Sequence, residues 1–130
     1  IDYDKWHSAM QQSQIMMITP ISNPCGWNLH PEDKIWIMEQ AAINDVIVIA
    51  DEAYNDAYRG LEDYRAIHSF GQNCISINSL TKVYAMGPIR FGWIISDKNT
   101  IAIARRIFMT FSGVMASPTM RIGAKALKRL

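Results

Sequence analysis

The stretch VIVIA at positions 46–50 constrains the fold of this chain more than any other part of the sequence. It holds four β-branched residues in a row, and no polar residue alternates with the apolar ones. Runs of this kind are typical of strands in a parallel sheet, where other elements cover both faces. The stretch therefore predicts a buried strand, and Asp51 comes directly at its end.

Three other stretches are expected to be strands of the same sheet. They are residues 15–18, 75–79 and 91–95. A loop rich in Pro, Asn, Ser and Gly, residues 19–26, follows the first strand, and a polar stretch, residues 55–68, follows the second.

Helices are expected between these strands. Residues 3–12 form a weakly amphipathic segment in which Trp6 and Met10 are four apart. A clear helix start lies at Pro31, because proline suits the first helical position and the two acids that follow complement the helix dipole. The residues expected to face inward from this helix are Ile35, Met38 and Ala42.

Two further helix starts follow the last expected strand. Asp97 or Asn99 could cap a helix that carries apolar residues at helical spacing. Ser117 is followed by Pro118, which predicts an N-cap and the first turn of a second helix.

Alternating strands and helices predict a three-layer α/β fold, with a largely parallel sheet and helices on both faces. Ligands of such sheets bind beyond the carboxyl ends of the strands. The polar residues expected at these ends are Asn23, Asp51, Tyr54, Ser79 and Lys82.

The composition is that of one ordinary globular domain. Its 13 basic and 12 acidic side chains leave a net charge of +1, which gives no electrostatic basis for nucleic-acid binding. No apolar run is long enough to span a membrane, and the N-terminal residues do not resemble an export signal. Cys25 and Cys74 have neither a CxxC partner nor neighbouring histidines, so we expect reduced thiols in a cytoplasmic protein and no metal site.

Asp51 and Lys82 each allow a catalytic and a structural interpretation. A carboxylate at the end of a buried strand needs a cation or a donor because desolvation of its charge is costly, but it could also simply cap the next turn. A lysine in partly apolar surroundings keeps some free amine that can attack an aldehyde, whereas a lone lysine usually lies on the surface. Ser79 and Arg90 would suit a phosphate group, or be an ordinary strand-end serine and surface arginine.

Three short motifs occur in order along the chain: NPCG at 23–26, DEAY at 51–54, and SLTK at 79–82, which is followed by Arg90 and Gly92. They resemble the Asn-Pro-Thr-Gly turn, the Asp-x-x-Tyr motif and the lysine segment of class I and II aminotransferases. These are pyridoxal-phosphate-dependent enzymes of the aspartate aminotransferase type, with fold type I. The resemblance covers nearly the whole chain.

The resemblance implies pyridoxal 5'-phosphate as the cofactor and a catalytic role for Lys82. This residue would form the internal aldimine and later shuttle a proton between the substrate α-carbon and the C4′ carbon of the cofactor. Asp51 would keep the pyridine nitrogen protonated, so that the ring can act as an electron sink.

The remaining site residues are implied to bind other parts of the cofactor. Asn23 and Tyr54 would donate hydrogen bonds to the phenolate oxygen of the ring. Ser79 and Arg90 would hold part of the phosphate.

The sequence departs from the family pattern at two places and lacks some of its parts. Cys25 replaces the usual threonine, and Gly87 and Pro88 replace a common Thr-Gly pair. The family's glycine-containing phosphate loop, its stacked aromatic ring and its carboxylate-binding arginine cannot be assigned. Residues 1–130 are therefore expected to be a fragment of one cofactor-binding large domain, with no second domain and no activity alone. The four strands would be neighbours in a larger sheet, the last of them antiparallel.

The expected function is transfer of an amino group between an α-amino acid and a 2-oxo acid, by a homodimer of the full-length protein. The same lysine and aspartate would also serve a decarboxylase or racemase of this fold. A non-catalytic sensor domain of a transcription regulator is an alternative of a different class. The third alternative is a partly folded piece that binds nothing.

Overall fold

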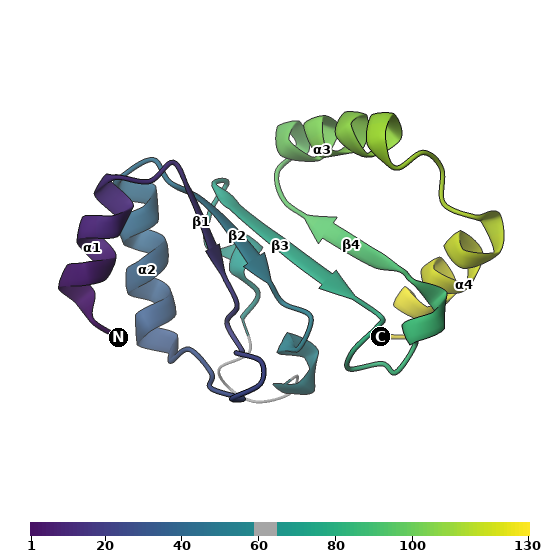
Figure 1. Ribbon diagram of the computed structural model, residues 1–130, viewed down its shortest axis with the longest axis horizontal. Coiled ribbons are helices and arrows are strands. Elements are labelled where there is room, and N and C mark those ends of the chain that lie inside the picture. The colour runs from purple at the N-terminus through teal and green to yellow at the C-terminus, as the bar shows by residue number, and fades with distance from the viewer. Residues whose placement is uncertain (59–64) are drawn as a thin grey trace.

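The computed structural model describes residues 1–58 and 65–130 (Figure 1). Residues 59–64, within the polar stretch 55–68, lie outside the described part. The four strands are β1 (Ile15–Ile18), β2 (Ile47–Asp51), β3 (Cys74–Ser79) and β4 (Gly92–Ile95). They form one sheet in the order β1-β2-β3-β4, so the four predicted strands are confirmed as neighbours.

The sheet is mixed, and its last strand runs against the others. β1 and β2 pair in parallel, as do β2 and β3. β4 pairs with β3 in antiparallel orientation, with Ile77 opposite Ile94 and Ser79 opposite Gly92. The predicted antiparallel last strand is therefore confirmed. The chain thus enters β4 at the same edge of the sheet at which it leaves β3.

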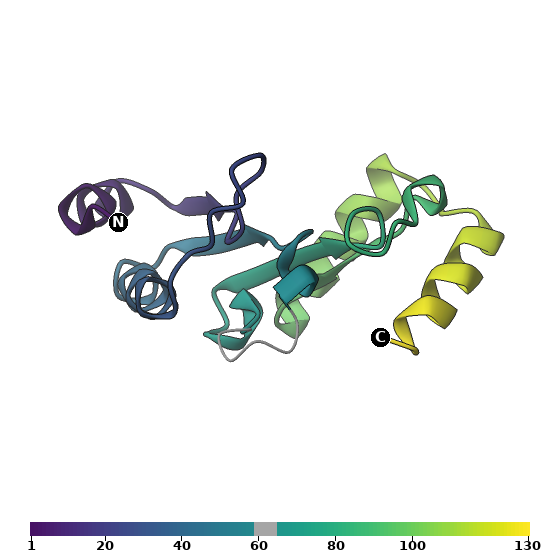
Figure 2. The same cartoon turned by 90° about the horizontal axis from the view of Figure 1, so that it is seen from below.

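In the described part of the chain, four helices accompany the sheet: α1 (Tyr3–Gln11), α2 (Pro31–Ile43), α3 (Lys98–Phe111) and α4 (Ser117–Leu127). Figure 1 shows α1 and α2 on the β1 side of the sheet and α3 and α4 on the β4 side. Figure 2 shows the twist of the sheet between these two groups of helices. The predicted α/β fold is confirmed. Three short 3₁₀ turns lie in the connections: η1 (Asn55–Tyr58), η2 (Ile67–Ser69) and η3 (Gly87–Ile89).

The N-cap of α3 is one of the two residues predicted from the sequence, whereas the N-cap of α4 is not the predicted one. The Asp97 carboxylate accepts from the backbone N–H groups of Asn99 and Thr100, so Asp97 is the cap of α3. Ser117 is the first residue of α4 rather than its N-cap, which is Ala116. The proline at the next position still suits the first turn, so the helix start is correct to one residue.

The main core lies between the helices α1 and α2 and one face of the sheet. Its largest fully buried side chains include Met10, Ile37 and Val48. Met38 faces this core as predicted, but the predictions for Ile35 and Ala42 are wrong, because both are exposed. The inward stripe of α2 instead consists of Lys34, Ile37, Met38 and Ala41, which follow the i, i+3, i+4, i+7 pattern.

Only one face of β2 is covered within the described residues. Val48 is 0% exposed against the core, whereas Ile47 on the other face is 43% exposed. The expectation that both faces of VIVIA are buried is therefore wrong here. The open face continues over the apolar side chains of Ile15, Met17 and Ile77. Within the described residues, none of the helices has the length and apolar character to cross a membrane.

Candidate functional site

An open cleft of about 980 Å³ lies between α3 and the carboxyl-terminal part of the open sheet face. Four of the predicted site residues line it: Asp51, Ser79, Lys82 and Arg90. The apolar walls come from Ile77 and Ile94 of the sheet and from Ile101 and Phe108 of α3. The structure therefore brings together one acid, one hydroxyl, one amine and one guanidinium.

Sheet topology explains why these four residues meet. Asp51 ends β2 and Ser79 ends β3, and parallel neighbours end at the same edge. Arg90 precedes β4, which begins at that edge because it is antiparallel to β3. The twelve or so residues between β3 and β4 thus carry Lys82 and return the chain to the cleft.

The loop between β3 and β4, which carries Lys82 and Arg90, is held together by backbone hydrogen bonds of Leu80, whose side chain is buried. Leu80 is 0% exposed, and its N–H donates to the Phe91 carbonyl at 3.0 Å. Its own carbonyl accepts from the Met86 N–H at 3.0 Å. Arg90 has a φ of 52°, a left-handed conformation that is uncommon for a residue with a Cβ.

Asp51 is exposed on the cleft, so the expected desolvation of its carboxylate is absent. The reason is that the described residues leave this part of the sheet face open. Its Oδ1 atom accepts from the N–H of Ala53 at 3.1 Å, which is the turn-capping contact that its position also predicted. As a lining residue of the cleft, Asp51 brings a carboxylate to its wall.

Asn23 and Tyr54 contact each other rather than the walls of the cleft. The Asn23 side-chain amide donates to the Tyr54 phenolic oxygen at 3.2 Å, and this bond joins the loop after β1 to the turn after β2. Because the tyrosine oxygen accepts here, its own O–H remains able to donate to a ligand.

Ser79 has a similar arrangement. Its hydroxyl oxygen accepts from the Thr81 N–H at 3.4 Å, while its backbone N–H donates to the Asn78 side chain at 2.6 Å. Its hydroxyl proton can therefore be offered to an anion, whereas its backbone N–H is already used.

Sequence reasoning missed several residues that line or support the site. Thr81, Trp93 and Arg105 line the cleft. Thr81 could have been predicted, because it lies inside the SLTK motif. Nothing in the sequence indicated that Arg105, on a helix, would line the cleft. Glu52 was also missed. It is buried beside Asp51, and period-2 alternation along the strand would have predicted that the two acids face opposite sides.

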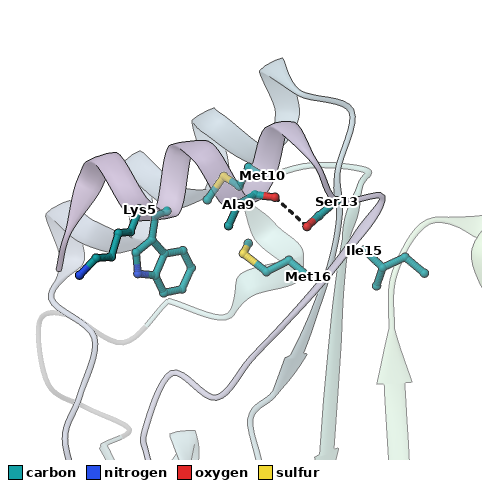
Figure 3. A pocket seen from close by; sticks show the side chains of 7 residues that line it. Lys5, Ala9, Met10, Ser13, Ile15 and Met16 are labelled. Atoms are coloured by element: carbon teal, nitrogen blue, oxygen red, sulfur yellow. Dashed lines mark hydrogen bonds between the residues drawn. The ribbon is translucent and has the colours of Figure 1, made fainter.

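A second pocket, of about 340 Å³, lies between α1 and β1 (Figure 3). Met10, Ile15 and Met16 line it, and Ser13 donates to the Ala9 carbonyl at its rim. It holds none of the predicted site residues. Within residues 1–58 and 65–130, no three acidic, histidine or cysteine side chains gather as a metal site. Cys25 is exposed and Cys74 buried, and both are free thiols.

Comparison with known proteins gives a consistent result. The family model for aminotransferase class I and II matches residues 1–129. The chain is 30% identical to the valine–pyruvate aminotransferase of Mycobacterium tuberculosis over 81 residues, which are 62% of this chain. It is 23% identical to the aspartate aminotransferase of Thermococcus kodakarensis over 127 residues, which are 96% of this chain.

The fold also matches a solved structure. A PLP-dependent aminotransferase from Streptococcus suis superposes with a TM-score of 0.86 over 98% of this chain, at 22% sequence identity. The chain spans 21% of the length of the M. tuberculosis protein, 34% of the T. kodakarensis protein and 34% of the S. suis protein.

Proposed function

The chain belongs to the class I and II aminotransferase family, and on that premise we propose that it is the cofactor-binding part of a pyridoxal-phosphate-dependent aminotransferase. The reaction is transfer of an amino group between an α-amino acid and a 2-oxo acid. One observation carries the proposal: Asp51, Ser79, Lys82 and Arg90 line a single cleft.

The chemistry of this side-chain set fits pyridoxal phosphate. A carboxylate suits the protonated ring nitrogen, and a primary amine suits the aldehyde. A hydroxyl and a guanidinium suit the phosphate. The cleft volume of about 980 Å³ is ample for a small cofactor. When bound, pyridoxal phosphate supplies an electron sink for negative charge at the substrate α-carbon.

Lys82 has two tasks in this proposal. Its Nζ atom would hold the cofactor, and the same amine would serve as the base and acid for the proton of the substrate α-carbon. Its exposure on the cleft supports both tasks, because the amine can reach a ligand from the connection between β3 and β4.

The other residues bind and orient. Asp51 would pair with the ring nitrogen and favour its protonated form. Tyr54, which accepts a hydrogen bond from Asn23, would donate its O–H to the phenolate oxygen of the ring. Ser79 would donate its hydroxyl to the phosphate, and Arg90 would contribute a permanent positive charge.

The complete enzyme requires more than these residues. The chain covers about a third of the length of the T. kodakarensis relative, so we propose that the rest of a full-length polypeptide supplies the phosphate loop and the carboxylate-binding arginine. In this proposal the chain is part of one large domain, the enzyme is a cytoplasmic homodimer, and residues 1–130 alone are inactive.

The test is covalent labelling of the complete gene product. The protein is mixed with pyridoxal phosphate, its visible absorption band is recorded, and borohydride then fixes the cofactor for peptide mapping. We expect the label on Lys82, its loss in Lys82→Ala, and its retention in Lys98→Ala, where an exposed lysine on α3 is removed. Label on another lysine, or no band, contradicts the proposal.

A second measurement separates an enzyme from a sensor domain. Added α-amino acid should rapidly convert the bound cofactor to its amine form, which absorbs at shorter wavelength. A protein that carries the label on Lys82 but is converted slowly or not at all would be a binding module.

A further inference from the structure

Glu52 is an almost completely buried acid next to an exposed one. It is 3% exposed, while the adjacent Asp51 is exposed on the cleft. The Glu52 N–H donates to the Ile77 carbonyl at 2.8 Å and so continues the pairing of β2 with β3. Because successive side chains of an extended chain point to opposite faces, Glu52 lies on the side of the sheet away from the cleft.

Two donors from two segments converge on one oxygen of the Glu52 carboxylate. The Ile67 N–H donates to Oε1 at 2.7 Å, and the Asn55 side-chain amide donates to the same atom at 3.0 Å. The Ser76 hydroxyl, on the neighbouring strand β3, accepts from the His68 N–H at 2.9 Å. Burial raises the pKa of Glu52, and the bonds from Ile67 and Ser76 act in the opposite direction. Both bonds require an acceptor oxygen at this position, which an apolar side chain does not have.

These contacts lead directly to the residues of the cleft. Asn55 follows Tyr54, and its backbone N–H donates to the Glu52 carbonyl at 2.9 Å. The turn that carries Tyr54 is therefore tied to Glu52 by both the backbone and the side chain of Asn55. The next residue, Asp56, accepts a hydrogen bond from the side-chain amide of Asn78 on β3 at 3.0 Å.

We propose that Glu52 is a positioning residue of the cofactor site, which holds the turn between Asp51 and Tyr54 through Asn55. This inference rests on the proposed function. A buried carboxylate oxygen that accepts two hydrogen bonds restrains the groups that donate them, and a site whose supporting contacts are fixed keeps its ligand groups in place. Loss of the Glu52 carboxylate lets the tyrosine hydroxyl move away from the phenolate oxygen of the cofactor.

The test uses the complete gene product loaded with pyridoxal phosphate. The readout is the pH midpoint of the visible absorption change of the lysine-bound cofactor. The Tyr54 hydrogen bond would favour the unprotonated form, so we expect Glu52→Leu, which removes the acceptor oxygen, to raise this midpoint by roughly half a unit to one unit, the equivalent of one hydrogen bond. The matched control is Asp33→Asn, a buried acid that accepts from Tyr3 between α1 and α2 and should leave the midpoint unchanged.

Two further variants separate positioning from general loosening. Asn55→Ala removes the link to Tyr54 and should raise the midpoint as Glu52→Leu does, so it also serves if Glu52→Leu fails to fold. Ser76→Ala removes the acceptor of the His68 N–H on the same side of the sheet and should lower the melting temperature without moving the midpoint. An equal rise in Ser76→Ala, or no rise in Glu52→Leu and Asn55→Ala, overturns the inference. If the wild-type protein carries no label on Lys82, the proposed function itself has failed, which is a different result.

Discussion

Gly123 of α4 lies directly against the aromatic ring of Phe91, so closely that a Cβ atom at position 123 would overlap the ring. Phe91 follows Arg90 in the chain, and α4 therefore packs against the backbone that presents this arginine to the cleft. The contact joins a helix near the end of the chain to the candidate phosphate site.

Substitution of this glycine tests the contact. Gly123→Ala improves intrinsic helix propensity by about 1 kcal/mol, but the overlap with Phe91 forces a shift that typically costs about 1–3 kcal/mol. We expect a net fall in the free energy of unfolding, measured by chemical denaturation. Gly87→Ala is the control, because a Cβ there meets nothing within 4 Å. A more stable Gly123→Ala protein would show that α4 is not fixed on Phe91.

The left-handed backbone of Arg90 can be separated from its charge by two substitutions. Arg90→Gly and Arg90→Ala both remove the guanidinium and should weaken pyridoxal-phosphate binding. At a φ of 52°, however, glycine relieves the steric cost that alanine keeps. After allowance for the greater chain entropy of glycine, we expect the glycine variant to be more stable by roughly 0.5–1 kcal/mol. Equal unfolding free energies would contradict this backbone conformation.

The raised pKa of Glu52 predicts how stability depends on pH. Burial is the main cause, and Asp56 adds to it, while the bonds from Ile67 and Ser76 and the nearby His68 oppose it. The folded state then binds the proton more tightly than the unfolded state does. Glu52 therefore stabilises the folded state fully at pH values below 4.5, the ordinary pKa of its carboxyl group. This stabilisation is lost as the pH rises through the raised pKa of the folded state.

The measurement compares melting temperatures of the wild type and Glu52→Gln from below pH 4.5 to neutral pH. The difference between the melting temperature of the wild type and that of Glu52→Gln should become smaller as the pH rises. Asp97→Ala gives the opposite sign, because hydrogen bonds from Thr100 hold the pKa of Asp97 below 3.8 and its contribution is lost as the pH falls. If the melting temperature of the wild type instead gained on that of Glu52→Gln as the pH rises, the pKa of Glu52 would not be raised.

The two helix starts near the end of the chain should respond differently to loss of their polar side chains. Asp97→Ala removes two hydrogen bonds to the first turn of α3 and should lower both helix content and melting temperature. Ser117→Ala should change neither, because Ser117 lies inside α4 and makes no capping bond. Circular dichroism of both variants decides the question, and equal effects would mean that Ser117 does cap its helix.

The sequence was sufficient for the strands and for the edge at which the site lies. VIVIA has one plausible structure, and parallel strands bring Asp51 and Ser79 to one edge without knowledge of any contact. The direct contact of Asn23 with Tyr54 was not predicted, because it joins two residues that lie 31 positions apart and the family resemblance implied only that both donate to the ring of the cofactor.

Other features depended on tertiary contacts that no local pattern reports. The inward face of α2 was misjudged because Asp33 and Lys34 are buried, and the hydroxyl of Tyr3 from α1 donates to Asp33 at 2.7 Å. The conformation of Arg90 goes against its own backbone preference, so propensity could not predict it. The exposure of Asp51 and Ile47 depends on what covers the sheet, and a strand's own residues do not determine that.

The connection between β3 and β4 has a mechanical consequence. Lys82 and Arg90 belong to one loop whose ends are joined by the bond from Leu80 to Phe91, whereas Asp51 belongs to a different turn. The backbone positions of Lys82 and Arg90 are therefore tied to each other within a single closed loop, and the position of Asp51 relative to them depends on the pairing of β2 with β3.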